Sequence, residues 1–98
     1  MGLRVRLTPR AARDLEDIHQ YLSQRSASGA NVVRRKIAEA IDLVALYPGL
    51  GRTTQKSGVV MIPVSTYTYV IYFSIIGNDL YVVHVRHGAR QTPKPEDL

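Results

Sequence analysis

The chain has 98 residues, a formal net charge of +5 at neutral pH and no cysteine. This length fits one domain, and the missing cysteine excludes disulfides and thiolate chemistry. No apolar run reaches the length of a membrane span or a signal peptide, so we expect a single cytoplasmic domain at 1–98 that does not associate with membranes.

The positive charge favours an acidic partner, either nucleic acid or an acidic protein segment. A modest imbalance without functional meaning fits the total charge equally well. The distribution is more informative, because no acidic residue occurs between Leu43 and Asn78. The second half of the chain therefore has a positive bias that its own sequence does not neutralise.

The first half predicts one strand and two helices. Residues 3–7 alternate between apolar and basic, as in a half-buried strand. Thr8 can cap a helix, and Pro9 suits its first position. Apolar residues then recur at helical spacing, at Ala11, Leu15, Ile18 and Leu22, so this helix is expected to run to about Arg25. Residues 26–29 should break it before a second helix, which shares one apolar face: Val33, Ile37, Ala40, Ile41 and Val44.

The second half changes to strand patterns. Residues 49–57 are polar and contain glycine, which predicts a loop. Strands are expected at 59–64, 66–76 and 80–86, the last two joined by a turn at 77–79. Pro63 cannot donate to a ladder and predicts an edge or a bulge. The order β-α-α-β-β-β predicts an α+β fold, a small antiparallel sheet with a two-helix hairpin on one face, and residues 91–98 form an extended or frayed tail.

Few residues suggest metal or nucleophilic chemistry. His84 and His87 are the closest histidine pair, but three positions apart on a strand they point to opposite faces and cannot readily share a metal. The serines lack a nucleophile elbow, and no glycine-rich phosphate loop is present. We therefore expect no metal and no cofactor. His84 is predicted to be a packed, hydrogen-bonded histidine, and His19 a boundary or surface residue.

Basic and aromatic side chains form the remaining candidate set. The basic members are Arg52, Lys56, Arg86, His87 and Arg90, and the tyrosines are Tyr67, Tyr69, Tyr72 and Tyr81. Such a set suits an anion-binding or RNA-cleaving surface, since cations stabilise a phosphorane and acid–base groups move its protons. The alternative is structural, because tyrosines in strands usually line the sheet.

Five ordered motifs resemble the RelE/ParE superfamily of bacterial type II toxin–antitoxin toxins, and specifically its ParE side. They are Leu7-Thr-Pro-x-Ala-x-x-Asp-Leu15, Ile18-x-x-Tyr-Leu22, Leu46-Tyr-Pro-Gly-x-Gly-Arg52, Tyr67-x-Tyr-Val-Ile-Tyr72 and Val85-Arg-His-Gly-Ala-Arg90. The resemblance covers nearly the whole chain. It implies a small antiparallel sheet with a two-helix hairpin, the same order that the residue patterns predict.

The resemblance implies two activities. RelE-like members cleave messenger RNA on the ribosome, whereas ParE-like members inhibit DNA gyrase and block replication. This sequence departs from the nuclease pattern. Val60 stands about where an arginine is common, and the tyrosine or extra basic residue expected after Arg90 is missing, since the tail reads Gln91-Thr-Pro-Lys-Pro-Glu-Asp-Leu98. The departure favours a gyrase inhibitor that is not an enzyme. The alternatives are a metal-independent endoribonuclease that uses Arg86, His87 and Arg90, and a member that only binds antitoxin.

The resemblance also implies a partner. We expect a cognate, ParD-like acidic antitoxin segment that folds on binding and forms a hetero-oligomer with this chain. The antitoxin-binding or target-binding residues are expected among Arg52, Tyr67, Tyr69, Arg86, His87 and Arg90. No helix-turn-helix or ribbon reader is recognisable, so direct sequence-specific binding of DNA by this chain is not expected.

Overall fold

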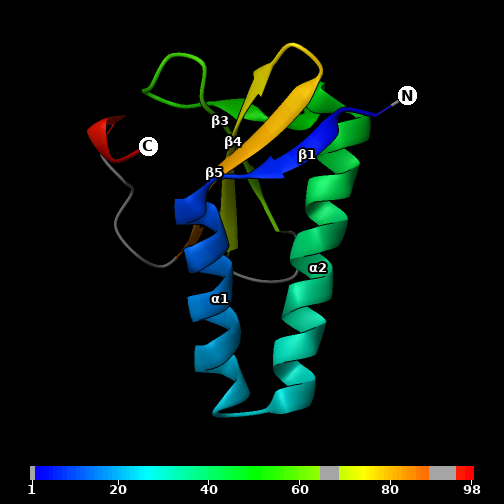
Figure 1. The fold of residues 1–98 in the computed structure, drawn as a ribbon, viewed down its shortest axis with the longest axis vertical. Coiled ribbons are helices and arrows are strands. Elements are labelled where there is room, and N and C mark those ends of the chain that lie inside the picture. The colour runs from blue at the N-terminus through cyan, green and yellow to red at the C-terminus, as the bar shows by residue number, and fades with distance from the viewer. Residues whose placement is uncertain (1, 65–68, 89–94) are drawn as a thin grey trace.

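A helical hairpin packs on one face of a five-stranded sheet in the computed structural model, which describes residues 2–64, 69–88 and 95–98 (Figure 1). The elements are β1 (Arg4–Leu7), α1 (Pro9–Ser23), α2 (Ala27–Leu46), the 3₁₀ turn η1 (Pro48–Leu50), β2 (Arg52–Thr53), β3 (Val60–Pro63), β4 (Tyr69–Ile76), β5 (Asp79–His87) and the 3₁₀ turn η2 (Pro95–Asp97). The strands lie in the order β1-β5-β4-β3-β2. The predicted α+β class with its two-helix hairpin is confirmed.

Hydroxyl caps set the start of both helices. The Thr8 side chain accepts a hydrogen bond from the Ala11 amide at 3.1 Å, and Pro9 takes the first helical position as expected. The Ser26 side chain accepts from the Gly29 amide at 3.0 Å. Because Ser26 caps α2, residues 27–29 belong to that helix, and the break between the helices is shorter than the sequence pattern predicts.

The sheet is mixed because its first strand pairs with its last. β4 and β5 form the predicted antiparallel hairpin, and Gly77 takes a positive φ of 60° in the turn. β1 lies parallel to β5, with Arg4 opposite Asp79 and a 2.9 Å ion pair between their side chains. The other pairs are antiparallel, as expected.

A two-residue strand, β2, extends the sheet at the opposite edge, within the segment that the sequence predicts as a loop. Arg52 pairs with Met61, and Thr53 pairs with Val60. Pro63 lies past this short strand and is paired only with β4, through Val70. Its missing N–H therefore faces an edge that has no partner strand among the described residues, which agrees with the prediction for Pro63.

The core lies between the helices and the sheet face that they cover. The predicted apolar stripe of α2 packs against alternate residues of β4 and β5. The buried members are Val33, Ile37, Ile41 and Val44 from α2, Tyr69, Ile71 and Phe73 from β4, and Leu80, Val82 and Val85 from β5. α1 and α2 both lie on this side, so neither of them covers the opposite face of the sheet, and two different surfaces are presented (Figure 1).

Candidate functional site

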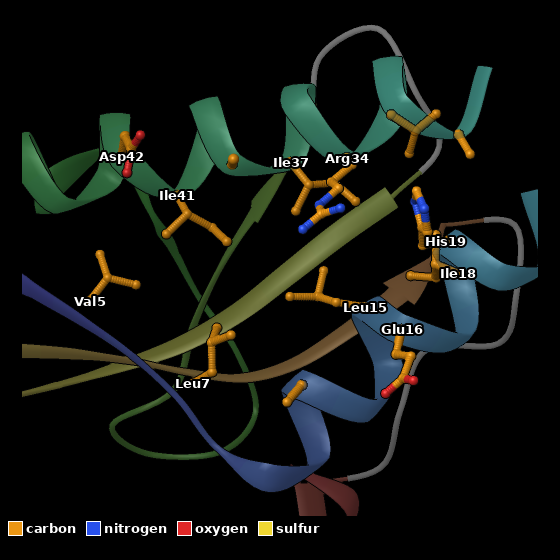
Figure 2. A pocket seen from close by; sticks show the side chains of 14 residues that line it. Val5, Leu7, Leu15, Glu16, Ile18, His19, Arg34, Ile37, Ile41 and Asp42 are labelled. Carbon is orange, nitrogen blue, oxygen red and sulfur yellow. The ribbon is translucent and has the colours of Figure 1, made fainter. Parts of the chain in front are cut away.

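An apolar groove opens between α1, α2 and β1 (Figure 2). Its volume is about 640 Å³, in the range of a binding cleft. The large apolar side chains that line it are Val5, Leu7, Leu15, Ile18, Val33, Ile37 and Ile41. Val5 and Leu7 keep 41% and 48% of their surface exposed, so apolar area meets solvent here. An exposed apolar cleft of this kind is typical of a protein-binding site.

The alternation in β1 explains why the groove is apolar. Arg4 and Arg6 both pair with Asp79, at 2.9 Å and 3.6 Å. Alternate residues of a strand point to opposite sides, so Val5 and Leu7 point into the groove instead (Figure 2). The same pattern predicted a half-buried strand from the sequence. The structure leaves all four strand residues exposed.

Three charged side chains stand at the rim of the groove. Glu16 comes from α1, and Arg34 and Asp42 come from α2 (Figure 2). None of the three makes an ion pair within the described part of the chain, whereas Glu39 on the same helix pairs with Arg35. With two carboxylates and one guanidinium, the rim does not share the positive bias of the chain. His19 also lines the groove, and its Nδ1 atom is buried without a hydrogen-bond partner among the described residues.

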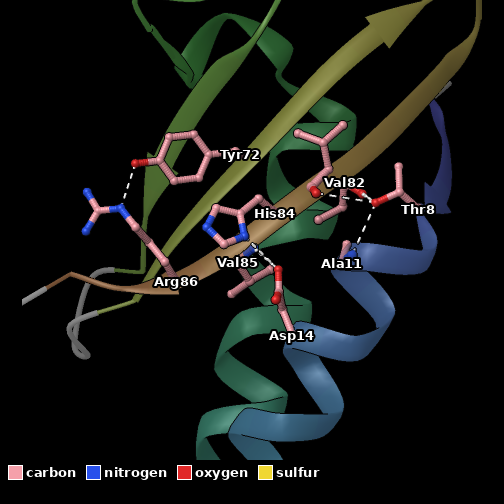
Figure 3. Close-up of polar contacts among 9 residues, drawn as sticks. Thr8, Ala11, Asp14, Tyr72, Val82, His84, Val85 and Arg86 are labelled. Atoms are coloured by element: carbon pink, nitrogen blue, oxygen red, sulfur yellow. Dashed lines mark hydrogen bonds and ion pairs between the residues drawn. The ribbon is translucent and has the colours of Figure 1, made fainter. Parts of the chain in front are cut away.

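Two of the predicted basic residues, Arg86 and His87, end β5 and form its basic tip, which is divided between the two faces of the sheet. Arg86 donates from Nε to the Tyr72 hydroxyl at 2.8 Å, on the face without helices (Figure 3). His87 pairs with Tyr69 on the helix-facing side, where their rings meet edge to face at 5.3 Å. Adjacent strand residues alternate in direction, so Arg86 and His87 do not share a surface.

The other predicted site residues are not collected beside Arg86. Arg52 lies on β2, and β3 and β4 separate that strand from β5. At the usual spacing between strands this separation is about 14 Å. Tyr67 and Arg90 lie outside the described residues, as does the predicted tail apart from residues 95–98, where η2 forms a 3₁₀ turn.

A second polar cluster joins α1 to β5. His84 Nδ1 lies 2.7 Å from Asp14 Oδ2, and the same oxygen accepts from the Val85 amide at 3.1 Å (Figure 3). The imidazole ring also stacks on Tyr72, with 5.6 Å between ring centroids. His84 is therefore a packed and hydrogen-bonded histidine, as predicted. Its ring stacks on Tyr72 and its Nδ1 atom contacts Asp14, so both features contribute to packing α1 and β4 against β5.

The part of the chain that the structure describes contains no cluster of metal-ligating side chains and no helix of membrane-spanning character. There, His, Asp and Glu side chains do not gather in threes as a metal site requires. His84 and His87 belong to opposite faces, as their spacing predicted. The helices among the described residues are too short or too polar to cross a bilayer.

The two-helix hairpin on a five-stranded mixed sheet defines a class of small α+β domains with known members. A chain of the structure titled "Chromosomal ParDE TA system from P. aeruginosa" shares the fold, with a TM-score of 0.77 and 19% identity over 88% of this chain and 96% of that chain. The profile for the ParE toxin of the type II toxin–antitoxin system parDE matches residues 5–92. The chain belongs to this family.

Two further relatives extend over nearly the same length. Y4kP of Sinorhizobium fredii is 30% identical over 91 residues, which cover 93% of this chain and 94% of the relative. Toxin RelE2 of Caulobacter vibrioides is 33% identical over 85 residues, which cover 85% of this chain and 92% of the relative. The predicted resemblance to RelE/ParE toxins is thereby confirmed.

Residue patterns missed the rim of the groove. Glu16, Arg34 and Asp42 are ordinary exposed positions of two amphipathic helices, and nothing in their spacing marks them. The division of the basic tip, by contrast, follows from the sequence. Arg86 and His87 are neighbours at the end of a predicted strand, and neighbouring strand residues point to opposite faces.

Proposed function

We propose that this ParE-family toxin acts on DNA gyrase, blocks replication and is neutralised by a ParD-like antitoxin. The observation that carries the proposal is the division of the basic tip. A metal-free nuclease needs several cations and an acid–base group around one phosphate. Here the side chains of Arg86 and His87 lie on opposite faces of the sheet, and Arg52 lies on a distant strand. This arrangement favours a toxin that acts by binding a protein.

The groove supports the antitoxin part of the proposal. An amphipathic segment that folds on binding gains affinity by burying an apolar stripe in a preformed groove. The exposed side chains of Val5 and Leu7 offer such a surface beside the helical hairpin. Acidic parts of the antitoxin would contact basic surface outside the groove, since the rim carries two carboxylates of its own. Toxin and antitoxin would form a hetero-oligomer in the cytoplasm.

A supercoiling assay tests the gyrase target. Purified toxin freed of antitoxin is expected to inhibit supercoiling by gyrase and to accumulate cleaved DNA complexes. Addition of antitoxin should restore supercoiling, which controls for a contaminating inhibitor. Unimpaired supercoiling at saturating toxin, with a folded protein by circular dichroism, would remove gyrase as the target.

A second candidate is a ribosome-dependent endoribonuclease. The Asp14–His84 pair favours it, because a carboxylate that orients an imidazole is a common arrangement for acid–base catalysis. One relative is also named Toxin RelE2. This candidate requires codon-dependent cleavage of messages in a translating extract, and a His84→Ala variant should lose it. Intact messages at a toxin concentration that arrests growth would exclude it.

A further inference from the structure

We propose that the groove selects its partner helix by charge. The occupant is an amphipathic helix whose apolar stripe lies on the groove floor, with a basic residue next to Asp42, an acidic residue next to Arg34 and a second basic residue next to Glu16. This assignment rests on the proposed antitoxin function. It differs from a general attraction between an acidic antitoxin and a basic toxin, since the groove itself requires mainly basic side chains on the flanks of its occupant.

The walls of the groove favour a helical occupant. Ile37 and Ile41 are spaced i, i+4 on α2, and Leu15 and Ile18 are spaced i, i+3 on α1, so each wall presents one helical ridge. A third helix can place its own apolar ridge between them, as in helix-in-groove recognition. Leu7 closes the groove at the β1 end (Figure 2).

The rim charges fix the spacing on the partner. Arg34 and Asp42 are eight positions apart on α2, which is about 12 Å along the helix axis. A helix lying beside α2 therefore meets them with two residues that are also about two turns apart, one acidic and one basic. Because neither side chain has an ion-pair partner in the described structure, each is available to the occupant.

A double-mutant cycle with a model helix tests this assignment. The probe is a fluorescein-labelled, end-capped peptide of roughly 16 residues, long enough to be helical when bound. It carries leucines at helical spacing, a lysine and a glutamate two turns apart on one flank, and a lysine on the other. Binding to the full chain is followed by fluorescence anisotropy.

The expected result is a charge-specific rescue. The peptide lysine that faces Asp42 is replaced by glutamate, which should weaken binding to the unmodified protein about fivefold. Asp42→Lys in the protein should recover most of that loss. The matched reversal Glu39→Lys, outside the groove, should recover none of it. Leu7→Ser, at an exposed position, should weaken all peptides alike.

Several outcomes would overturn the assignment. They are additive penalties in the cycle, equal rescue by Glu39→Lys, undiminished binding to Leu7→Ser, and no binding of any peptide to the folded protein. The measurement does not involve gyrase. Failure here would thus leave the gyrase proposal standing, and a negative supercoiling assay would leave the charge selection of the groove standing.

Discussion

At the scale of single residues, Asp14 accepts a backbone hydrogen bond of β5 that a longer β1 would otherwise accept. β1 ends at Leu7, so among the described residues the edge of β5 that faces β1 has no partner strand beyond Val82. Two side chains bond to β5 in place of a strand. The Thr8 hydroxyl donates a hydrogen bond to the Val82 carbonyl at 3.1 Å, and the Asp14 carboxylate accepts one from the Val85 amide. Side chains from the start of α1 thereby satisfy an open sheet edge.

Removal of this acceptor should destabilise the protein. Asp14→Ala leaves the Val85 amide and His84 Nδ1 without their partner, with an expected cost of about 2 kcal/mol in the free energy of unfolding. Asp14→Asn keeps one acceptor oxygen and should cost less. Chemical denaturation followed by circular dichroism measures both.

Asp17→Ala is the matched control, because Asp17 is exposed on the same helix and has no ion pair in the described part of the chain. It should change stability by less than about 0.5 kcal/mol. If Asp14→Ala were as mild as Asp17→Ala, the connection between α1 and β5 would not contribute to stability.

At the scale of elements, the segment from η1 to β2 is held against the sheet by a close contact at Gly51. A Cβ atom at this position would lie 2.3 Å from Val60 Cγ1 and 2.7 Å from Phe73 Cζ. Only glycine allows β2 to approach β3 this closely. The contact sets where β2, and with it Arg52, joins the edge of the sheet.

Gly51→Ala should therefore destabilise the protein by about 2 kcal/mol, since Val60 or Phe73 must move to admit the methyl group. Gly49→Ala provides a control two positions away, where a Cβ atom meets nothing within 4 Å. Thermal unfolding of the two variants compares them directly. Equal melting temperatures would show that the segment adapts without cost.

Local patterns predicted most elements and the β4–β5 hairpin, but not the pairing of β1 or the presence of β2. Thr8 and Pro9 marked the start of α1, and Gly77 marked the β4–β5 turn, because caps and turns depend on adjacent residues. The parallel pairing of β1 with β5 joins residues 75 positions apart, and no local signal specifies it. β2 has only two residues, which is too few for a period to be read.

The candidate site was predictable only in part for the same reason. The groove is formed by three elements brought together in space, and its rim charges are unremarkable along the chain. The Asp14–His84 contact spans 70 positions. Sequence patterns therefore identified His84 as a packed residue without identifying its partner.

At the scale of the whole molecule, the groove and Arg86 occupy opposite sides of the sheet. The groove lies among the helices and β1, whereas Arg86 contacts Tyr72 on the face without helices (Figures 2 and 3). Two partners that use these surfaces would not compete for the same side chains. We therefore expect that antitoxin affinity and toxicity respond to different substitutions.

Charge reversal at Arg86 tests this separation. Arg86→Glu should abolish growth arrest on induction without antitoxin, because it replaces a half-buried guanidinium on the face opposite the helices by a carboxylate. Binding of the model helix in the groove should stay within about twofold. Tyr72→Phe removes only the hydrogen bond to Arg86, and Arg35→Glu reverses a charge on the outside of α2.

Both control variants should remain toxic. Growth arrest by Arg86→Glu equal to that of the unmodified chain would show that this residue does not engage the target. Loss of groove binding in the same variant would contradict the independence of the two surfaces.

The pairing of β1 with β5 has a consequence for the order of events during synthesis. Val5 and Leu7 are synthesised well before β5, the strand that fixes them, because paired residues of the two strands are 75 positions apart. The helical hairpin depends on contacts between neighbouring segments and can form sooner. The β1 side of the groove is therefore completed only after β5 has been synthesised, so we expect an antitoxin segment that contacts Val5 and Leu7 to bind the folded domain and not the earlier helical hairpin.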